Sequence, residues 1–446
     1  MKRIFSTIIA TAVVLAAAAQ PAKHVILVSI DGFRPDFYLD PSWPAPNLQS
    51  IKANGVYAEE VRSIFPSVTY PSHTTLVTGA LPARHGIYYN TPFQTNGRGD
   101  WPTEAKEVKS ETIWAAAKKA GLKTASVSWP VTVGAPIDYN LPEIWSKTDP
   151  SDRRGAISES ATPRGLFEEM TDKVIGHIEA SSLNLQYFDI DENNSRMAAY
   201  ILQKYKPSLL TIHIVSVDGA QHKHGRSGAE VRRAVAVADH AVSNLIDGLE
   251  KAGIKDQTAI IITGDHGFSD IHSALAPNVW LAEKGLAGAK NNEGWKAMFH
   301  TASGSAFLHL SKKGDTKTLN EVKALLNGLP QKYRSLFRIV ERSELDKIGA
   351  DPNAVLALAP MKGISMNGST EGEPLKPAKG GTHGFYPDFH EIQTGFIAAG
   401  AGIEKGTVIP QMALEDIAPI VAKLLGFEFN APDGKFLPSV LSTNKK

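Results

Sequence analysis

Aspartates and histidines that could bind metal lie just beyond three apolar segments of this sequence. Each segment is followed by an aspartate: Asp31 after residues 24–30, Asp218 after residues 208–217, and Asp265 after residues 258–262. Apolar, β-branched runs of this length are typical of buried strands. In open α/β sheets the carboxyl ends of the strands form the ligand crevice, so we expect the three carboxylates to converge there.

Three histidines extend this set to six potential ligands. His222 stands four residues after Asp218, His266 directly follows Asp265, and His383 lies in a glycine-rich segment. Converging carboxylates repel one another and resist burial unless a cation compensates them. Imidazole combined with carboxylate suits zinc better than magnesium or calcium, and six ligands are too many for one tetrahedral zinc. The set therefore indicates two metal ions, an arrangement that serves in-line displacement at phosphorus.

Thr69 is the candidate nucleophile. It precedes Tyr70-Pro71 and an apolar helical stretch that Gly79 closes. Threonine is a good N-cap, proline suits the first helical turn, and the amino end of a helix attracts anions. The local pattern alone favours a simple helix cap. Only the neighbouring ligand set makes a zinc-activated hydroxyl the better interpretation.

Alternating apolar runs and helical patterns predict an α/β fold, with a mainly parallel central sheet flanked by helices. The expected strands are residues 24–30, 123–129, 208–217, 258–262 and 394–400. The expected helices are residues 110–120, with Ser110 as N-cap and Gly121 just past the end, then 229–251 and 416–425. Strands that alternate with helices in this way place their carboxyl ends at one edge of the sheet.

Residues 20–446 are expected to form a single catalytic domain with two insertions. The segments at about 131–206 and 270–381 break the alternation, and we expect them to form a cap over the site. The 446-residue chain has 47 Lys and Arg against 46 Asp and Glu, without a basic block that would suggest a nucleic-acid-binding patch. It has no cysteine, which excludes disulfides and thiolate chemistry.

Residues 1–19 have the pattern of a secretory signal peptide. Lys2 and Arg3 are followed by an apolar stretch and by the small residues Ala17 and Ala19, which predicts cleavage before Gln20. The alternative is a membrane anchor, but the apolar part is shorter than the roughly 20 residues that a span needs. No later segment is apolar enough to span a bilayer. We therefore expect a secreted or periplasmic protein.

Five motifs resemble, in order and spacing, the nucleotide pyrophosphatase/phosphodiesterase family of the alkaline phosphatase superfamily: DGFRPDF, FPSVTYPSHTTLVTGALPARHGIYYN, DGAQHKHG, GDHGFSD and GTHGFYPD. The resemblance implies an alkaline-phosphatase-like fold, two Zn²⁺ ions and a small-molecule phosphodiester or nucleotide substrate. It assigns one zinc to Asp31, Thr69, Asp265 and His266, and the other to Asp218, His222 and His383. Thr69 would form a phospho-threonine intermediate that water hydrolyses.

The resemblance also suggests substrate contacts. Asn90 matches an asparagine whose amide binds a phosphate oxygen, and Tyr70 matches an aromatic residue of the leaving-group or base slot. His213 stands where the family often has a base-stacking tyrosine. Trp129 occupies a position where related monoesterases carry a Lys-x-Arg pair, so a monoanionic diester is favoured.

Several alternatives stay open after the resemblance. They are a hydrolase of phosphonates or phospholipid headgroups, a phosphomonoesterase, and a catalytically silent metal-binding relative. A sulfatase is excluded, since that class needs Cys or Ser at the position of Thr69.

Overall fold

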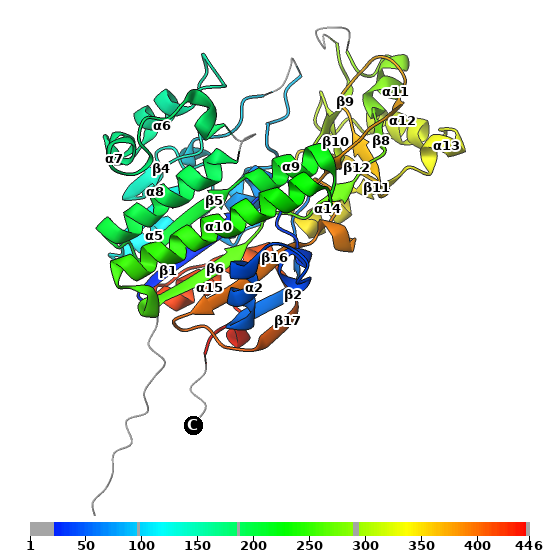
Figure 1. Ribbon diagram of the computed structural model, residues 1–446. Helices are drawn as coiled ribbons and strands as arrows, with labels where there is room; N and C mark the ends of the chain where they lie inside the picture. Colours follow the sequence, from blue (N-terminus) through cyan, green and yellow to red (C-terminus); the bar gives the residue numbers. More distant parts are fainter. Residues whose placement is uncertain (1–21, 96–98, 185–187, 289–293, 443–446) are drawn as a thin grey trace, which may run out of the picture.

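The computed structural model describes residues 22–95, 99–184, 188–288 and 294–442, so the predicted signal peptide lies outside the described residues. An eight-stranded sheet in the order β17-β2-β16-β6-β1-β5-β3-β4 forms the centre of the fold (Figure 1). Its strands are β1 His24–Ile30, β2 Val56–Arg62, β3 Thr124–Val127, β4 Tyr139–Leu141, β5 Leu209–Ile214, β6 Thr258–Thr263, β16 Thr394–Gly400 and β17 Thr407–Ala413.

Strand β1 lies in the middle of the sheet and pairs in parallel with both β5 and β6. Val28 is in register with Ile212 on one side and with Ile262 on the other. Strand β16 runs antiparallel to its neighbours β6 and β2. Strands that are buried on both faces read as continuous apolar runs, which is why the sequence predicted them. The predicted α/β class with a mainly parallel sheet is confirmed.

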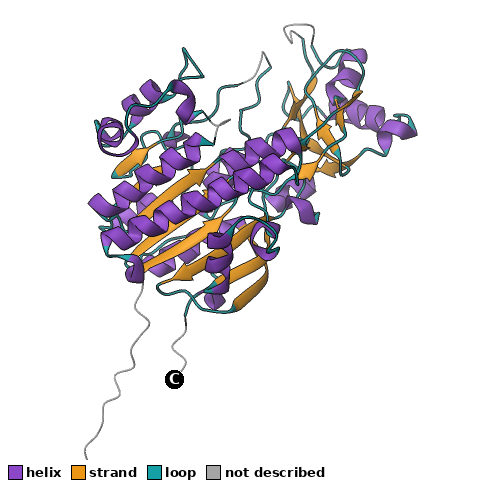
Figure 2. Cartoon of the chain, in the orientation of Figure 1, coloured by secondary structure: helices purple, strands orange, loops and turns teal. Residues whose placement is uncertain are grey.

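Helices cover both faces of the sheet, and β1 contributes alternate side chains to the two resulting cores. Ile26, Val28 and Ile30 pack in one core with residues of α8 and α10, whereas Val25 and Leu27 pack in the other with residues of α3, α5 and α15. Figure 2 shows the long helices lying across the strands. The helices of these layers are α2 Pro46–Ala53, α3 Thr69–Thr78, α5 Ile113–Lys119, α8 Asp189–Tyr205, α9 Ser216–His224, α10 Ala229–Ala252 and α15 Ile417–Leu425. The short helices α1 Asp36–Leu39 and α4 Pro82–His85 lie in the connections.

Two of the differences from the predicted element boundaries have a clear structural cause. Helix α5 begins at Ile113 and not after Ser110, because the Thr112 side chain caps it by accepting the Ala115 N–H. Strand β5 ends at Ile214, three residues earlier than predicted. The Asp191 carboxylate accepts the next two backbone N–H groups, so the chain turns into α9 and Asp218 lies on a helix.

The two predicted insertions have different structures. Segment 131–206 contains α6 Arg154–Ser160 and α7 Leu166–Met170, but it also supplies β4 at the sheet edge and α8, which packs with α10. Both β4 and α8 are thus part of the central layers of the fold.

Segment 270–381 forms a four-stranded antiparallel sheet, in the order β11-β12-β10-β9, with a hydrophobic core of its own. Its elements are β7 Ser269–Asp270, β8 Ser273–Leu275, α11 Pro277–Glu283, β9 Ala297–Thr301, β10 Ala306–Leu310, α12 Thr316–Asn327, α13 Gln331–Arg334, β11 Phe337–Glu341, α14 Arg342–Ile348, β12 Leu356–Pro360, β13 Ile364–Met366, β14 Leu375–Pro377 and β15 Gly381–Thr382. Among the described helices, none combines the length and apolar character that a bilayer crossing requires.

Candidate metal centre

The first part of the centre lies at the carboxyl ends of β1 and β6. Asp31 directly follows β1, and Asp265 and His266 come just after β6. His266 Nε2 is 3.3 Å from Asp31 Oδ1 and 3.1 Å from Asp265 Oδ2. Gly32, in a left-handed conformation with φ +69°, lets the chain turn so that its N–H donates to Asp265 Oδ1 at 3.1 Å. The parallel pairing of the two strands thus brings two carboxylates and an imidazole together.

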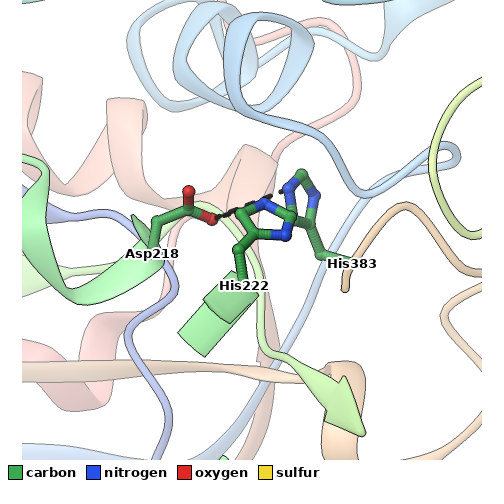
Figure 3. A group of neighbouring side chains, drawn as sticks. All are labelled: Asp218, His222 and His383. Carbon is green, nitrogen blue, oxygen red and sulfur yellow. Dashed lines mark ion pairs between the residues drawn. The ribbon is translucent and has the colours of Figure 1, made fainter. Parts of the chain in front are cut away.

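The second part of the centre joins α9 to the segment after β15 (Figure 3). Asp218 and His222 are one helical turn apart, and Asp218 Oδ1 lies 3.4 Å from His222 Nε2 and 3.6 Å from His383 Nε2. Gly380, with φ +87°, packs so closely that an added Cβ would lie 2.0 Å from the His222 carbonyl oxygen. A side chain at that position would therefore push the His383 segment away from α9.

The two parts adjoin one another. Single ligand atoms of Asp31, Asp218 and His266 lie within 4.8 Å of one another, as do those of Asp218, His222 and His383. The rings of His266 and His383 stack with centroids 3.7 Å apart. The structure therefore gathers the six ligands expected from their residue types and positions into one site.

The three histidines of the candidate centre share one orientation. Each places Nδ1 near a backbone carbonyl oxygen: His222 near Gly381 at 3.1 Å, His266 near Gly267 at 3.1 Å, and His383 near Ser67 at 3.0 Å. A carbonyl oxygen only accepts hydrogen bonds, so each Nδ1 must carry the hydrogen. Every Nε2 is then left with a lone pair that faces the centre, as in protein zinc sites.

Four buried atoms at the centre have no hydrogen-bond partner: Asp31 Oδ1, Asp218 Oδ1, Asp265 Oδ2 and His266 Nε2. Buried polar atoms without partners are costly and uncommon in folded proteins. With the three carboxyls ionised, all four are electron-pair donors, so they cannot satisfy one another. A bound divalent cation would satisfy them together, and the residues present therefore fit a metal.

The electrostatics of the centre agree with this. Burial raises the pKa of Asp31 well above its usual value, and the nearby carboxylate of Asp218 raises it further. Burial and the charge of Asp31 likewise raise the pKa of Asp265. Burial lowers the pKa of His266 well below its usual value and that of His383 to about 4, so both are neutral at pH 7. The carboxylates lack a compensating charge that a cation would supply.

Thr69 is the first residue of α3. The N-cap position belongs to Val68 and Thr69 makes no side-chain cap bond, so the predicted N-cap role was wrong. Gly79 ends the helix in the left-handed conformation, as predicted. His73 Nδ1 lies 2.8 Å from the Thr69 carbonyl oxygen and 3.7 Å from Asp265 Oδ2. The first turn of α3 therefore lies beside the ligand cluster.

Asn90 is held against the start of α3. Its Oδ1 accepts the backbone N–H of Tyr70 at 2.8 Å. Because this bond uses the oxygen, the NH₂ end of the amide is the part left to donate to a ligand. Asn90 thus contacts Tyr70, the neighbour of Thr69, and its NH₂ group is available as a hydrogen-bond donor.

The other three residues expected to contact substrate are buried in this conformation. Tyr70 is 0% exposed, its ring packs edge-on against Trp101, and its hydroxyl donates to Glu143. Trp129 is 0% and His213 1% exposed. A ring with almost no accessible surface cannot stack on a bound group, so these side chains support the centre from behind and do not form a pocket wall.

Sequence reasoning missed Glu143, which is 1% exposed and contacts both Tyr70 and His213. It lies in the irregular segment 131–206 and belongs to no motif, so no pattern pointed to it. His73 also lies at the centre, 3.7 Å from Asp265 Oδ2, and is not among the predicted ligands. Its position four residues after Thr69 would have placed both on one face of a helix.

A cleft of about 760 Å³ lies next to Asn90, and residues 91–94, Gly99 and residues of segment 270–381 line it. Its floor includes Thr91, next to Asn90, and Ser303, next to the Gly304 that packs against the His383 carbonyl. Its polar side chains are Thr91, Gln94, Asn278, His300, Thr301, Ser303, Asn367, Ser369, Thr370 and Glu371. No Lys or Arg is among the described residues that line it.

Comparison with known proteins identifies relatives of this chain. The family model for type I phosphodiesterase / nucleotide pyrophosphatase matches residues 25–385. Ectonucleotide pyrophosphatase/phosphodiesterase family member 3 of Rattus norvegicus is 28% identical over 249 residues, which cover 54% of this chain and 24% of that protein. Venom phosphodiesterase 2 of Crotalus adamanteus is 24% identical over 414 residues, 90% of this chain and 45% of the relative. The chain thus spans less than half the length of either relative.

Solved structures show the same fold. Human ectonucleotide pyrophosphatase/phosphodiesterase 5 aligns with a TM-score of 0.69 at 19% identity, covering 94% of this chain and all of that one. An inactive variant of the murine protein, in complex with AMP, aligns with a TM-score of 0.67 at 20% identity and covers 94% of this chain and 97% of that one.

Proposed function

Because the chain belongs to the type I phosphodiesterase / nucleotide pyrophosphatase family of the alkaline phosphatase superfamily, we propose that it is an exported, zinc-dependent phosphodiesterase that acts through Thr69. The observation that carries this proposal is the set of buried, unpaired donor atoms on Asp31, Asp218, Asp265 and His266. Export rests on the signal-peptide pattern of residues 1–19.

The proposed ligand sets follow the family resemblance. One metal would be held by Asp31, Thr69, Asp265 and His266, and the other by Asp218, His222 and His383. When bound, the two zinc ions would supply positive charge at the phosphate and lower the pKa of the attacking hydroxyl.

Thr69 and Asn90 perform the chemical steps in this proposal. The Thr69 hydroxyl gives up its proton to solvent and its oxygen attacks phosphorus. The bond from phosphorus to the leaving oxygen breaks, and the leaving group takes up a proton and departs as an alcohol. Water then attacks the phosphorus of the phospho-threonine, the bond from phosphorus to the Thr69 oxygen breaks, Thr69 takes back a proton, and the monoester product is released. The Asn90 NH₂ donates to a non-bridging oxygen, whose negative charge grows during each attack.

Asn90→Asp is expected to lower kcat by roughly 10²- to 10³-fold, the range typical for loss of one such donor. The substitution keeps the oxygen that accepts the Tyr70 N–H, so α3 should keep its position. Steady-state kinetics with a chromogenic diester, together with thermal unfolding, measures both effects. A kcat equal to that of the wild type would remove Asn90 from the proposed role.

A monoanionic diester is the substrate class that the charges favour. The charged groups that shift the pKa of Asp31 and Asp265 most strongly are other carboxylates and His213. In the described part of the chain, no Lys or Arg is among these groups. A dianionic monoester would therefore lack protein cations to neutralise it. Among the described residues that line the cleft beside Asn90 there is likewise no Lys or Arg.

A comparison of substrates on the zinc-loaded protein tests this proposal. We expect bis-p-nitrophenyl phosphate to be hydrolysed with a higher kcat/KM than p-nitrophenyl phosphate. Faster turnover of p-nitrophenyl phosphate would indicate a phosphomonoesterase. Faster turnover of ATP, with release of AMP, would assign the chain a nucleotide pyrophosphatase activity.

A further inference from the structure

A buried pair formed by Glu143 and His213 lies behind the metal centre. His213 Nδ1 is 3.0 Å from Glu143 Oε2, and its Nε2 is 3.2 Å from Asp31 Oδ2. The two residues are 1% exposed. The imidazole therefore bridges Glu143, which is not a proposed metal ligand, and Asp31, which is one.

This contact distinguishes the two oxygens of Asp31. Oδ2 faces His213, whereas Oδ1 has no hydrogen-bond partner and lies 3.3 Å from His266 Nε2. A carboxylate held at one oxygen presents the other in a defined direction, and partners of this kind orient ligands in many metal sites.

Glu143 also reaches the other side of the same centre. Its Oε1 accepts the Tyr70 hydroxyl at 2.9 Å, and Tyr70 is the neighbour of Thr69. One buried carboxylate thus connects the residue beside the nucleophile with the ring that holds Asp31. Arg153, also buried, lies close enough for its charge to act on Glu143, which reduces the cost of burying the acid.

We propose that Glu143 and His213 are positioning residues that hold Asp31 with Oδ1 directed at the metal. This inference rests on the proposed metal centre but adds to it two residues outside the ligand set. It predicts that loss of the His213–Asp31 contact weakens metal binding even when all seven proposed ligands are intact.

Two substitutions of His213 separate its two contacts. In His213→Gln the side-chain NH₂ group can occupy the position of the His213 Nε2 atom and donate to Asp31. In His213→Asn the shorter amide ends at the position of the Nδ1 atom, from which it can reach only Glu143. The control is Thr211→Val, two residues earlier on β5, which removes the buried hydrogen bond from Thr211 to Ser126 and touches no proposed ligand.

Zinc affinity, measured by competition with a chromophoric chelator on the purified full-length protein, is the readout. We expect His213→Asn to weaken zinc binding about 10- to 100-fold, which is typical of residues that orient ligands. His213→Gln should keep most of the zinc affinity of the wild type. Glu143→Gln should weaken zinc binding less than His213→Asn does, and Thr211→Val should leave it unchanged. All of these variants are expected to lose some stability, and thermal unfolding of each one measures that loss.

The outcomes separate this inference from the proposed function. If the wild type binds zinc and His213→Asn binds it equally well, the positioning role is refuted while the metal centre stands. The same holds if Thr211→Val weakens zinc binding as much as His213→Asn does. If the wild type binds no zinc, both the centre and the inference are refuted.

Discussion

Thr69→Ala is expected to abolish phosphodiester hydrolysis, with a loss in kcat of roughly 10⁴- to 10⁶-fold, as is typical when a nucleophile is removed. The reason is that no other hydroxyl would form the covalent intermediate. Bound zinc should remain near two ions per chain, because six Asp and His ligands stay in place. Steady-state kinetics and elemental analysis of the same preparation measure both quantities.

Thr74→Ala is the matched control for this experiment. Thr74 lies in the same helix, is buried, and donates its hydroxyl to the Tyr70 carbonyl oxygen. Its loss should lower stability slightly and leave turnover close to that of the wild type. Equal activity of Thr69→Ala and the wild type would remove Thr69 from the mechanism, whereas an equal loss in both variants would indicate a general effect on α3.

Asp265→Asn is expected to have opposite effects on activity and on the stability of the metal-free protein. Activity should fall roughly 10³-fold or more, since loss of a ligand should exceed the 10- to 100-fold effect typical of a residue that only orients one. The metal-free protein should become more stable at pH 8, by on the order of 1–3 kcal/mol. The amide carries no charge, and its NH₂ can donate to His266 Nε2, which lies 3.1 Å from the replaced oxygen.

The direction of the pH dependence follows from the raised pKa of Asp265. Its carboxyl is protonated in both folded and unfolded protein below its usual pKa of 3.8, so ionisation has no cost there. As the pH rises from 3.8 to the higher folded-state pKa, the unfolded chain ionises while the folded protein keeps this carboxyl protonated, so the folded state loses stability relative to the unfolded state. Chelator-treated wild type should therefore be less stable at pH 8 than at pH 5, and Asp265→Asn should show a smaller difference.

Thermal unfolding at both pH values, with and without zinc, measures these effects. Zinc should raise the melting temperature of the wild type far more than that of Asp265→Asn. Asp351→Asn is the control, since Asp351 is buried outside the centre and accepts hydrogen bonds from Tyr89 and Asn353. It should lose stability and keep its zinc. Full zinc binding by Asp265→Asn would contradict the proposed ligand set.

The strand-end aspartates illustrate what local sequence can predict. Apolar runs before Asp31 and Asp265 indicated buried parallel strands, and the carboxyl ends of such strands meet at one edge of a sheet. Asp218 was expected at a strand end but lies on α9, because the distant Asp191 carboxylate accepts the backbone N–H groups that follow β5. A contact between residues so far apart leaves no periodic signal in the sequence.

The supporting side chains show where such prediction stopped. Tyr70, Trp129 and His213 were expected to face a substrate, but they are buried, and Glu143 was not predicted at all. His213 lies on the buried parallel strand β5, and such strands carry apolar side chains on both faces, so they lack the polar alternation that would show which face is open.

The sequence by itself determined the kind of chemistry, since residue types and their positions after strands specified a cysteine-free site of carboxylates and imidazoles. Only the tertiary structure decided which atoms are available to a metal. It brings His222 and His383, which are separated by 160 residues in the sequence, into the same site. It also engages the second nitrogen of His222 and of His383, and the second oxygen of Asp31, in bonds to partners from distant segments. Those bonds depend on side-chain direction and long-range packing, neither of which spacing along a chain encodes.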